Sequence, residues 1–466
     1  MTKRRRFIYG NKSMMTYDIT DERRDEYRRA SVEARLAKQR ALEGHGPEPI
    51  HQINRPRFDP SQLMPFQPGH GLRALSLFSG GGGLDLGFEH AGFEHVASYD
   101  IIPICGATIR ENRPSWEVFA GPDDGDVRKV DWQRYRSQAG VIHGGPPCQP
   151  FSIAGQQQGE LDERNMWGEF IRAIHEVRPR AFVAENVLGL TSPKFAGFLE
   201  ANISEPLRDY STSLFEMNSA DFGVPQGRRR VIIVGFQSPD AMSRFSRPEP
   251  THTWHHLGTK DAPAPQMQLF GASELAKTMG AREALGLPDL GFDSLAPTLR
   301  SGFTGKRNTT SILNSKAAER AWAELEIWGS GVQSNRERAH RFVAKNGHFR
   351  LSVQDCGLMQ GFPENWKFSG AVYQILGQIG NSVAPVVGYQ VGRAVAEALS
   401  GSLEASKQAT CAGRAKVAED WDVDTVRVDC EGCTECLTAK CDLCSTPTKP
   451  GESICWDCAE SVARDA

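Results

Sequence analysis

A single cysteine stands in a loop whose composition suits nucleophilic chemistry. Cys148 directly follows the run Val141-Ile-His-Gly-Gly-Pro-Pro147, so it lies just past an expected strand, among glycines and prolines. An isolated cysteine is usually a small buried hydrophobe, but these neighbours indicate a fixed, exposed loop. Because the thiolate is the nucleophile in cysteine chemistry, the loop must also favour ionisation. The sequence therefore predicts a nucleophile at Cys148.

A glycine-rich run predicts a second site, for a nucleotide-like cofactor. Leu75-Ser-Leu-Phe-Ser-Gly-Gly-Gly-Gly-Leu-Asp-Leu-Gly87 places glycines after an apolar strand and before a helical stretch. Glycines allow a tight turn and a close approach of ligand to backbone, and the N-terminus of the next helix offers free amides. Taken alone, the run is also explained by a structural loop or by a dinucleotide site.

Two acidic residues further along are candidates for holding such a cofactor. Asp100 ends the next expected strand, at the spacing where a carboxylate commonly binds ribose hydroxyls. Asp126 stands in Gly-Asp-Val-Arg, where it could accept a hydrogen bond from an adenine amino group. Each acid taken singly is more often a cap or turn residue. Their order behind the glycine-rich run is what favours a ligand role.

The end of the chain carries a cysteine cluster of a different kind. Seven of the 11 cysteines lie between residues 430 and 458. Two Cys-x-x-Cys pairs separated by ten residues predict a structural zinc site with four thiolate ligands, and an Fe–S cluster is the minor alternative. The four predicted ligands are Cys441, Cys444, Cys455 and Cys458. A further group is Cys430, Cys433 and Cys436, with Cys411 as a candidate fourth ligand.

The elements that must position these residues follow from hydrophobic patterning. Between Leu72 and Phe236, short apolar runs alternate with helical stretches. Such alternation predicts an α/β fold of the Rossmann-like kind, a mostly parallel sheet with helices on both faces. Ligands then belong at the carboxyl ends of the strands. The expected strands are Arg73–Phe78, His95–Asp100, Ala139–His143, Arg180–Glu185 and Arg230–Gly235.

Changes in composition divide the chain into five expected parts. Residues 1–70 form an arm with a charged helix from Asp21 to about Glu43, followed by a proline-rich loop. Residues 71–236 hold the regular pattern, which fades through 237–345, returns in 346–402 and gives way to a cysteine-rich tail in 403–466. The irregular stretch predicts a smaller domain, and the tail predicts a zinc-ribbon-like unit.

Bulk properties exclude several classes of protein. Hydrophobic residues make up 39% and charged residues 24% of the 466 residues, which excludes a wholly disordered or fibrous chain. The net charge of −3 is weak evidence for or against nucleic-acid binding, because a cleft can be basic in a near-neutral protein. Neither a signal peptide nor a membrane span is recognisable, and clustered thiols suit a reducing compartment. We therefore expect a cytoplasmic protein.

Beyond these separate signals, ordered motifs resemble those of the DNA cytosine-5 methyltransferase family. The Cys148 loop, Gly145-Pro-Pro-Cys-Gln-Pro-Phe-Ser152, resembles the catalytic motif of that family. The further motifs are Glu185-Asn-Val187, Gln226-Gly-Arg-Arg-Arg230, Arg350-Leu-Ser-Val-Gln-Asp-Cys-Gly-Leu-Met-Gln-Gly-Phe-Pro363 and Gly380-Asn-Ser-Val383. The resemblance extends from about Leu72 to Leu399. It implies transfer of a methyl group from S-adenosylmethionine to carbon 5 of a flipped-out cytosine in double-stranded DNA.

The same resemblance implies roles for individual residues. Cys148 would attack carbon 6 of cytosine, Glu185 would stabilise charge near ring nitrogen 3, and Arg230 would bind the carbonyl, with Arg228 supporting the loop or substrate. Phe78 would stack on adenine, and Trp167, where an aliphatic residue is usual, would cover its other face. The implied donor site comprises Phe78, Ser79, Gly80, Gly82, Asp100, Asp126, Pro147, Trp167, Asn381 and Ser382. Residues 237–345 would read the DNA sequence.

Other hypotheses about the function explain some of the same motifs. An RNA cytosine-5 methyltransferase would use the same chemistry, although the long stretch before the late motif favours DNA. A catalytically silent, zinc-bearing DNA-binding protein would not need Cys148, Glu185 and Arg230 together. We expect a monomer that belongs to a restriction-modification system, with a cognate restriction endonuclease acting on the same site. A nicotinamide-dependent oxidoreductase would explain only the glycines and Asp100.

Overall fold

A central sheet of seven strands is built mainly from the short apolar runs. The computed structural model describes residues 21–147, 166–258, 275–301, 303, 309–344 and 346–400. The five expected strands are confirmed as β1 (Arg73–Leu77), β2 (Glu94–Asp100), β4 (Val141–Gly144), β5 (Ala181–Asn186) and β8 (Arg229–Phe236). Sequence analysis missed the short β3 (Val118–Ala120) and the edge strand β6 (Ser211–Asn218).

The order of the strands is β3-β2-β1-β4-β5-β8-β6. All pairs from β3 to β5 are parallel, as predicted, whereas β8 runs antiparallel to both β5 and β6. The chain leaves β1 in one direction, towards β2 and β3, and returns on the other side to form β4 and β5. This reversal between β1 and β4 is the switch point where α/β sheets bind ligands.

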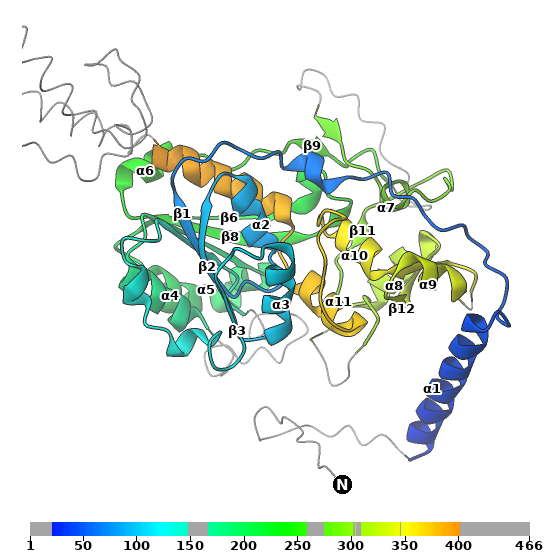
Figure 1. Ribbon diagram of the computed structural model, residues 1–466. Coiled ribbons are helices and arrows are strands. Elements are labelled where there is room, and N and C mark those ends of the chain that lie inside the picture. Colours follow the sequence, from blue (N-terminus) through cyan, green and yellow to red (C-terminus); the bar gives the residue numbers. More distant parts are fainter. Residues whose placement is uncertain are drawn as a thin grey trace, which may run out of the picture. The chain divides into compact units, whose positions relative to one another are not determined.

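Helices cover both faces of the sheet (Figure 1). On one face, α4 (Trp167–Val177), α5 (Ala196–Leu199) and the adjoining turns pack into a large apolar cluster with side chains of the strands. On the other face, α2 (Gly83–His90) packs against the helical residues 385–396: a Cβ at Gly87 would lie 2.4 Å from the Pro385 carbonyl oxygen. The helix α3 (Pro103–Asn112) follows β2.

A second apolar cluster lies beyond the sheet and unites two stretches of sequence. Residues of the irregular stretch, such as Leu285 and Trp322, pack with late residues such as Met359 and Ile379. The cluster therefore crosses residue 345, where we expected one part to end and another to begin. Its helices are α7 (Ala281–Leu285), α8 (Lys316–Glu324), α10 (Val353–Met359) and α11 (Val372–Asn381), and its strands are β11 (Ala296–Pro297), β12 (Ile327–Gln333) and β13 (Phe349–Ser352). The helix α9 (Arg336–Arg341) packs against β12 and β13.

The proline-rich part of the arm is a strap that contacts the second cluster and the end of α2; we use that name for residues 50–70. Phe58 is buried in the second cluster, and its backbone N–H and that of Arg57 donate to the Ala284 carbonyl. Met64 is also buried, and its carbonyl accepts a bond of 2.6 Å from His90 at the end of α2. This irregular sequence has a fixed path because its residues 57 and 58 are bonded to the second cluster and Met64 is bonded to α2.

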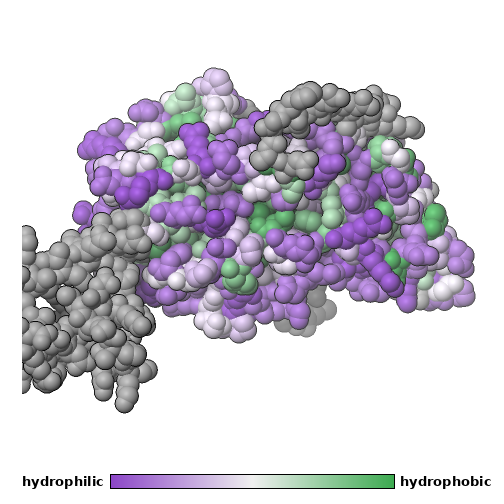
Figure 2. Space-filling model, turned by 90° about the horizontal axis from the view of Figure 1, so that it is seen from above, coloured by the Kyte–Doolittle hydropathy of each residue, from purple (hydrophilic) through white to green (hydrophobic). Residues whose placement is uncertain are grey.

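The remaining elements are peripheral. The expected charged helix is confirmed as α1 (Asp21–Leu42), and no helix in the described ranges is long and apolar enough to cross a membrane. Among described residues on the face shown in Figure 2, hydrophilic side chains predominate and hydrophobic ones form small separate areas. The other short elements are β7 (Gln226–Gly227), α6 (Pro239–Arg244), β9 (His252–Thr253) and β10 (Ala276–Lys277).

Candidate active site

The predicted site residues meet because they follow paired positions of the sheet. Leu77 on β1 pairs with Tyr99 on β2 and with Gly144 on β4, and Gly144 pairs with Ala184 on β5. The next residue in each strand is Phe78, Asp100, Gly145 or Glu185, so all four lie at the same edge. Gly144 has no room for a side chain, since its Cβ would lie 2.4 Å from the Leu77 carbonyl oxygen.

Glu185 lies near the end of β5 and is held by an arginine of β8. It is 8% exposed, and Arg230 Nε lies 2.8 Å from its Oε1. Burial raises the pKa of Glu185, and the positive charges of Arg230 and Arg228 oppose that rise. A carboxyl group whose pKa is raised can hold a proton and donate it, while the guanidinium fixes its orientation.

The loop that leads to Cys148 starts beside this carboxyl group. A Cβ on Gly145 would lie 3.1 Å from Glu185 Oε2, so glycine permits the loop to pass over the acid. Asn186 donates a hydrogen bond of 3.1 Å to the Pro146 carbonyl and so fixes the start of the loop. Pro147 is the last described residue before Cys148, which lies outside the described residues.

The glycine-rich turn is tied to Asp100 through backbone amides. Gly80 N–H and Ile102 N–H each donate a bond of 2.8 Å to the Asp100 carboxylate, one to each oxygen. Phe78 has a φ of +56°, a left-handed conformation that costs a non-glycine residue roughly 1–3 kcal/mol and that recurs at ligand sites. Gly80 and Gly82 also have positive φ, at +55° and +81°. The turn is therefore preformed around the acid.

Burial raises the pKa of Asp100 to about 6, against the lowering effect of the two backbone amides. Ser79 is buried beside it: its hydroxyl lies 2.8 Å from the hydroxyl of Ser76 and donates to the Tyr99 carbonyl. The first turn of α2 begins at Gly83, so free helix amides point towards the same edge. These groups suit a ligand with hydroxyls and an extended polar chain, such as a nucleoside derivative.

The late motif around Asn381 returns to this turn. A Cβ on Gly83 would lie 2.2 Å from the Val383 carbonyl oxygen, and one on Gly81 would lie 2.9 Å from Ser382 Oγ. Ser382 is buried and donates to the Gln378 carbonyl, whereas Asn381 is exposed. Two segments about 300 residues apart in sequence therefore form one wall, as the resemblance implied.

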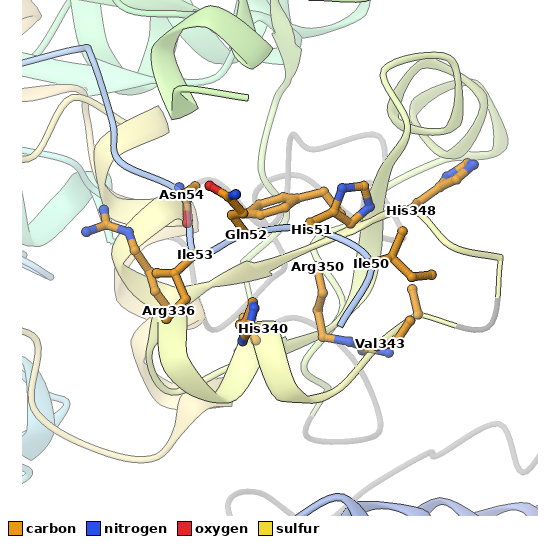
Figure 3. Close-up of a pocket in the computed structure, with 13 residues that line it drawn as sticks. Ile50, His51, Gln52, Ile53, Asn54, Arg336, His340, Val343, His348 and Arg350 are labelled. Atoms are coloured by element: carbon orange, nitrogen blue, oxygen red, sulfur yellow. The ribbon is translucent and has the colours of Figure 1, made fainter. Parts of the chain in front are cut away.

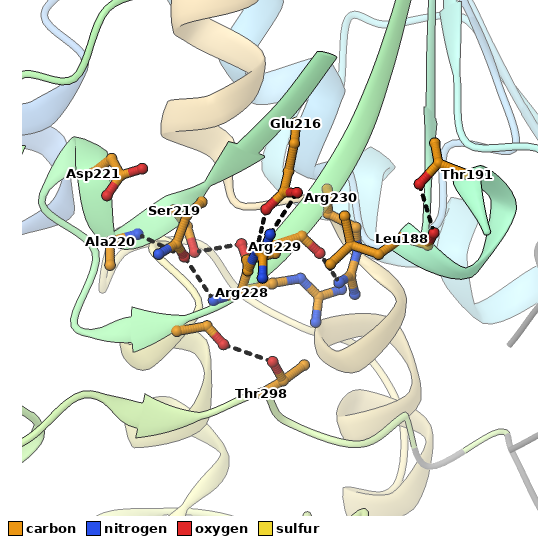
Figure 4. Close-up of polar contacts among 12 residues, drawn as sticks. Leu188, Thr191, Glu216, Ser219, Ala220, Asp221, Arg228, Arg229, Arg230 and Thr298 are labelled. Carbon is orange, nitrogen blue, oxygen red and sulfur yellow. Dashed lines mark hydrogen bonds and ion pairs between the residues drawn. The ribbon is translucent and has the colours of Figure 1, made fainter. Parts of the chain in front are cut away.

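Arg228 lies inside the protein and supports the late motif. It is 2% exposed, and its Nη2 donates to the Gly380 and Ser382 carbonyls at 2.9 and 2.8 Å. Arg229, the next residue, points the other way and pairs with Glu216 on β6 (Figure 4). Of the alternatives for Arg228, loop support is the one that these bonds favour.

Two predicted donor-site residues have structural partners of their own. Asp126 caps a short helical turn and accepts bonds from Arg128, at 2.8 Å from Nε and 2.7 Å from Nη2, and these bonds lower its pKa. Trp167 is fully buried, edge-to-face with Phe170, in the cluster under the sheet. The contacts of both with adenine remain predictions.

Sequence analysis missed three polar residues that hold the site together. Asn186 anchors the Cys148 loop, Gln226 is fully buried and donates to the Met359 carbonyl, and Gln360 donates to the Ser382 carbonyl. Each stands inside one of the quoted motifs, so the motif was the available signal. The residue type alone does not distinguish an amide that bridges two segments of the protein from an amide that binds a ligand.

A groove in the second cluster lies apart from these strand ends. It has an empty volume of about 340 Å³ and is lined by strap residues 50–54 and by α9 and β13, including Arg336 and Arg350 (Figure 3). His51 in the strap contacts the Gly347 carbonyl at 2.8 Å. None of its lining residues belongs to the predicted site.

The predicted metal ligands all lie in the tail, outside the described residues. Within the part of the chain that the structure describes, no group of three or more His, Cys, Asp or Glu side chains could hold a metal ion. Cys105 and Cys356, which are described, are buried, and burial raises the pKa of both thiols. Neither resembles a reactive thiolate.

Comparison with known proteins places the fold and the site in context. Residues 72–397 match the family described as C-5 cytosine-specific DNA methylase. The Type II methyltransferase M.NgoMIV of Neisseria gonorrhoeae is 33% identical over 70% of this chain and 97% of its own length. The Type II methyltransferase M.NaeI of Lentzea aerocolonigenes is 32% identical over 71% of this chain and 76% of its own.

Solved structures similar to this chain include two methyltransferases. A DNA modification methyltransferase encoded within a prophage of E. coli covers 72% of this chain and all of its own, with a TM-score of 0.44 and 20% identity. The Dnmt2 methyltransferase of S. pombe covers 71% of this chain and 99% of its own, with a TM-score of 0.43 and 16% identity.

Proposed function

The chain belongs to the C-5 cytosine-specific DNA methylase family, and from that premise we propose that it methylates carbon 5 of cytosine at a specific DNA site through a covalent adduct with Cys148. The observation that carries this proposal is the pairing of Glu185 with Arg230, 2.8 Å apart, beside the start of the Cys148 loop. An acid and a cation at that place can bind nitrogen 3 and the carbonyl at the edge of a cytosine ring while a thiolate attacks carbon 6 from one face.

Carbon 5 of cytosine is a poor nucleophile, so the ring must first lose its aromaticity. The Cys148 thiolate forms a bond to carbon 6, and the electron pair of the ring double bond moves towards carbon 5 and nitrogen 3. Glu185 shares a proton with nitrogen 3 and stabilises that charge, which is why a raised pKa is useful here. Arg230 orients Glu185 and binds the cytosine carbonyl.

The residues at the other strand ends fit the methyl donor. Asp100 offers a preformed carboxylate to ribose hydroxyls, Phe78 offers a ring face to adenine, and the amides of the glycine-rich turn accompany Ser382. Asp126, Pro147, Trp167 and Asn381 complete the proposed donor site. When bound, S-adenosylmethionine supplies the electrophilic methyl group.

The cycle closes by elimination. After carbon 5 has gained the methyl group, a base removes its proton, the double bond to carbon 6 forms again and the bond to Cys148 breaks. Because both faces of the ring are needed, the cytosine must leave the duplex stack. We propose that residues 237–345 read the surrounding sequence, that the enzyme acts as a monomer, and that it protects DNA against a restriction endonuclease of the same specificity.

Bisulfite sequencing of DNA from cells that produce the intact protein or its Cys148→Ser variant tests this function. Methylated cytosines in one sequence context are expected only with the intact protein. Cytosines that stay unmethylated in the presence of the intact protein would overturn the proposal, and the same sequencing of RNA, if it alone showed methylation, would replace DNA as the substrate. Duplexes containing 5-fluorocytosine should trap the intact protein covalently, since fluorine at carbon 5 does not leave as a proton does. A trapped Cys148→Ser protein would place the nucleophile elsewhere.

We also propose that the tail binds zinc without taking part in methyl transfer. The support is its spacing, with Cys441, Cys444, Cys455 and Cys458 as ligands and Cys430, Cys433 and Cys436 as a further group. Elemental analysis of the purified protein should find zinc, and Cys441→Ser with Cys444→Ser should lower the content. A metal-free wild-type protein would exclude the site.

A further inference from the structure

Residues 226–230, which run from β7 into the start of β8, contact both the half of the proposed site that would hold the target base and the half that would hold the methyl donor. Because side chains alternate along an extended chain, Arg228 and Arg230 point to one side and Arg229 to the other. Arg230 meets Glu185 at the end of β5, while Arg229 pairs with Glu216 at the surface. The three arginines in the motif therefore divide into two inward residues and one outward residue.

The inward Arg228 reaches the donor half. It donates to the Gly380 and Ser382 carbonyls, and Ser382 lies against the glycine-rich turn. A buried guanidinium with fixed carbonyl partners resists movement, because breaking its bonds would leave charge and donors unsatisfied. A shift of Arg230 on entry of the target base would therefore be transmitted to the wall of the donor site.

Residues 296–301, which belong to the proposed recognition region 237–345, contact this segment as well. Their first residues form β11, which pairs with Gln226–Gly227 in β7. Thr298 Oγ1 donates a bond of 2.6 Å to the Gly227 carbonyl, as Figure 4 shows. Ser301 then packs on the end of α11, where a Cβ on Gly380 would lie 2.5 Å from its backbone nitrogen.

We propose that Thr298 is a positioning residue that couples binding of the target DNA to binding of the methyl donor. Thr298 bonds to Gly227, next to Arg228, and Arg228 in turn bonds to the carbonyl of Gly380, against which Ser301 packs. These contacts form a closed circle that begins and ends in the recognition region. The inference rests on the proposed function and adds the route by which a correct DNA site tightens the donor site. Thermodynamic linkage requires the coupling to be equal in both directions.

The test measures binding, so it does not depend on turnover. Affinity for S-adenosylhomocysteine is measured by calorimetry on the full chain, with and without a duplex carrying the site that bisulfite sequencing identifies. We expect the duplex to tighten binding of this thioether, S-adenosylhomocysteine, by roughly tenfold in the wild type. Thr298→Val, which keeps the shape and removes the hydroxyl, should reduce this factor to about twofold or less, with affinity for the thioether alone changed less than about threefold.

Thr278→Val is the matched control. Its hydroxyl also donates to a backbone carbonyl of the catalytic part, that of Ala220 at 2.8 Å, but outside this circle of contacts. The control should keep the wild-type factor. Gly380→Ala provides a second, steric perturbation and should also reduce it, because the added methyl group displaces Ser301.

The outcomes separate the two proposals. Equal coupling factors in Thr298→Val and wild type, or no coupling in the wild type, would overturn the inference while leaving cytosine methylation intact. Equal losses in Thr298→Val and Thr278→Val would also overturn it, since a general loosening would then be responsible. A wild-type protein that binds neither the thioether nor the duplex would instead overturn the proposed function.

Discussion

Two buried carboxylates end strands of the same sheet, but they are held by different kinds of group. Asp100, the last residue of β2, accepts from two backbone amides, those of Gly80 and Ile102. Glu185, at the end of β5, relies on the side chain of Arg230. Burial raises the pKa of both. A backbone-held acid stays in place whatever the nearby side chains do, whereas an arginine-held acid can be adjusted by its partner.

This difference suits the two proposed tasks. A site for a donor that is bound in every cycle benefits from a rigid acceptor, and Asp100 provides one. Glu185 would share a proton with a target cytosine that enters and leaves in every cycle. A counter-charge on a side chain, that of Arg230, can adjust as the cytosine comes and goes. The comparison predicts that changes at Glu185 affect the chemical step, and that changes at Asp100 affect donor affinity.

The largest effect is expected for Glu185→Gln. It removes the proton shared with the base, so the rate of methyl transfer in a single turnover should fall about 10²- to 10⁴-fold. Binding of S-adenosylhomocysteine should stay near the wild-type value. Glu216→Gln is the control, because it breaks the exposed pair with Arg229 and should cost less than about 1 kcal/mol of stability. A normal rate in Glu185→Gln would remove the basis of the comparison.

Asp100→Asn should mainly weaken donor binding. The amide keeps one acceptor oxygen for two backbone donors and loses the negative charge, which corresponds to roughly ten- to a hundredfold in affinity. The KM for the donor should rise, and kcat at saturating donor should change little. Steady-state kinetics with varied donor separates the two constants. A fall in kcat at unchanged KM would instead show that Asp100 acts in the chemical step, and would contradict its role in donor binding.

The affinity for the donor should also depend on pH, through titration of Asp100. With its pKa raised to about 6, Asp100 is ionised above that pH and protonated below it. Because ribose hydroxyls need the ionised form as acceptor, affinity for S-adenosylhomocysteine should be level above pH 6 and fall about tenfold per unit well below it. Calorimetry between pH 5 and 8 checks this. The same titration of Asp100→Asn should be nearly flat.

The smallest effect is expected at Asp126, whose partner is a solvent-facing arginine. The Arg128 side chain is 55% exposed, so Arg128→Ala should cost less than about 1 kcal/mol of stability and change donor affinity less than about threefold. Thermal unfolding and calorimetry measure the two quantities. A loss as large as that of Asp100→Asn would show that this pair also positions the donor.

The sequence predicted the part of the fold that has continuous apolar runs. Buried parallel strands such as β4 and β5 show such runs, and the rule for parallel sheets placed Asp100 and Glu185 at one edge. The edge strand β6 was missed because only alternate residues are buried, which weakens the apolar signal. The three residues of β3 are too few to show a pattern.

The contacts that join the halves of the site were beyond sequence analysis. The motif predicted that Arg228 matters, but its bonds to Gly380 and Ser382 span more than 150 residues and follow from the packing of α11. The long-range contacts of the strap were equally hidden, since its proline-rich sequence has no periodicity to indicate a partner.

The strap also has a practical consequence for anyone who wishes to transplant this catalyst. The family match begins at residue 72, yet Phe58 and Met64 are buried and bonded before that point. Full burial of such side chains contributes about 1.5–3 kcal/mol each. A fusion or gene fragment that started at residue 72 would expose two apolar surfaces at once. The portable piece therefore begins before residue 51, because His51 already contacts the Gly347 carbonyl and Asn54 then bonds to Leu285 and Asp355.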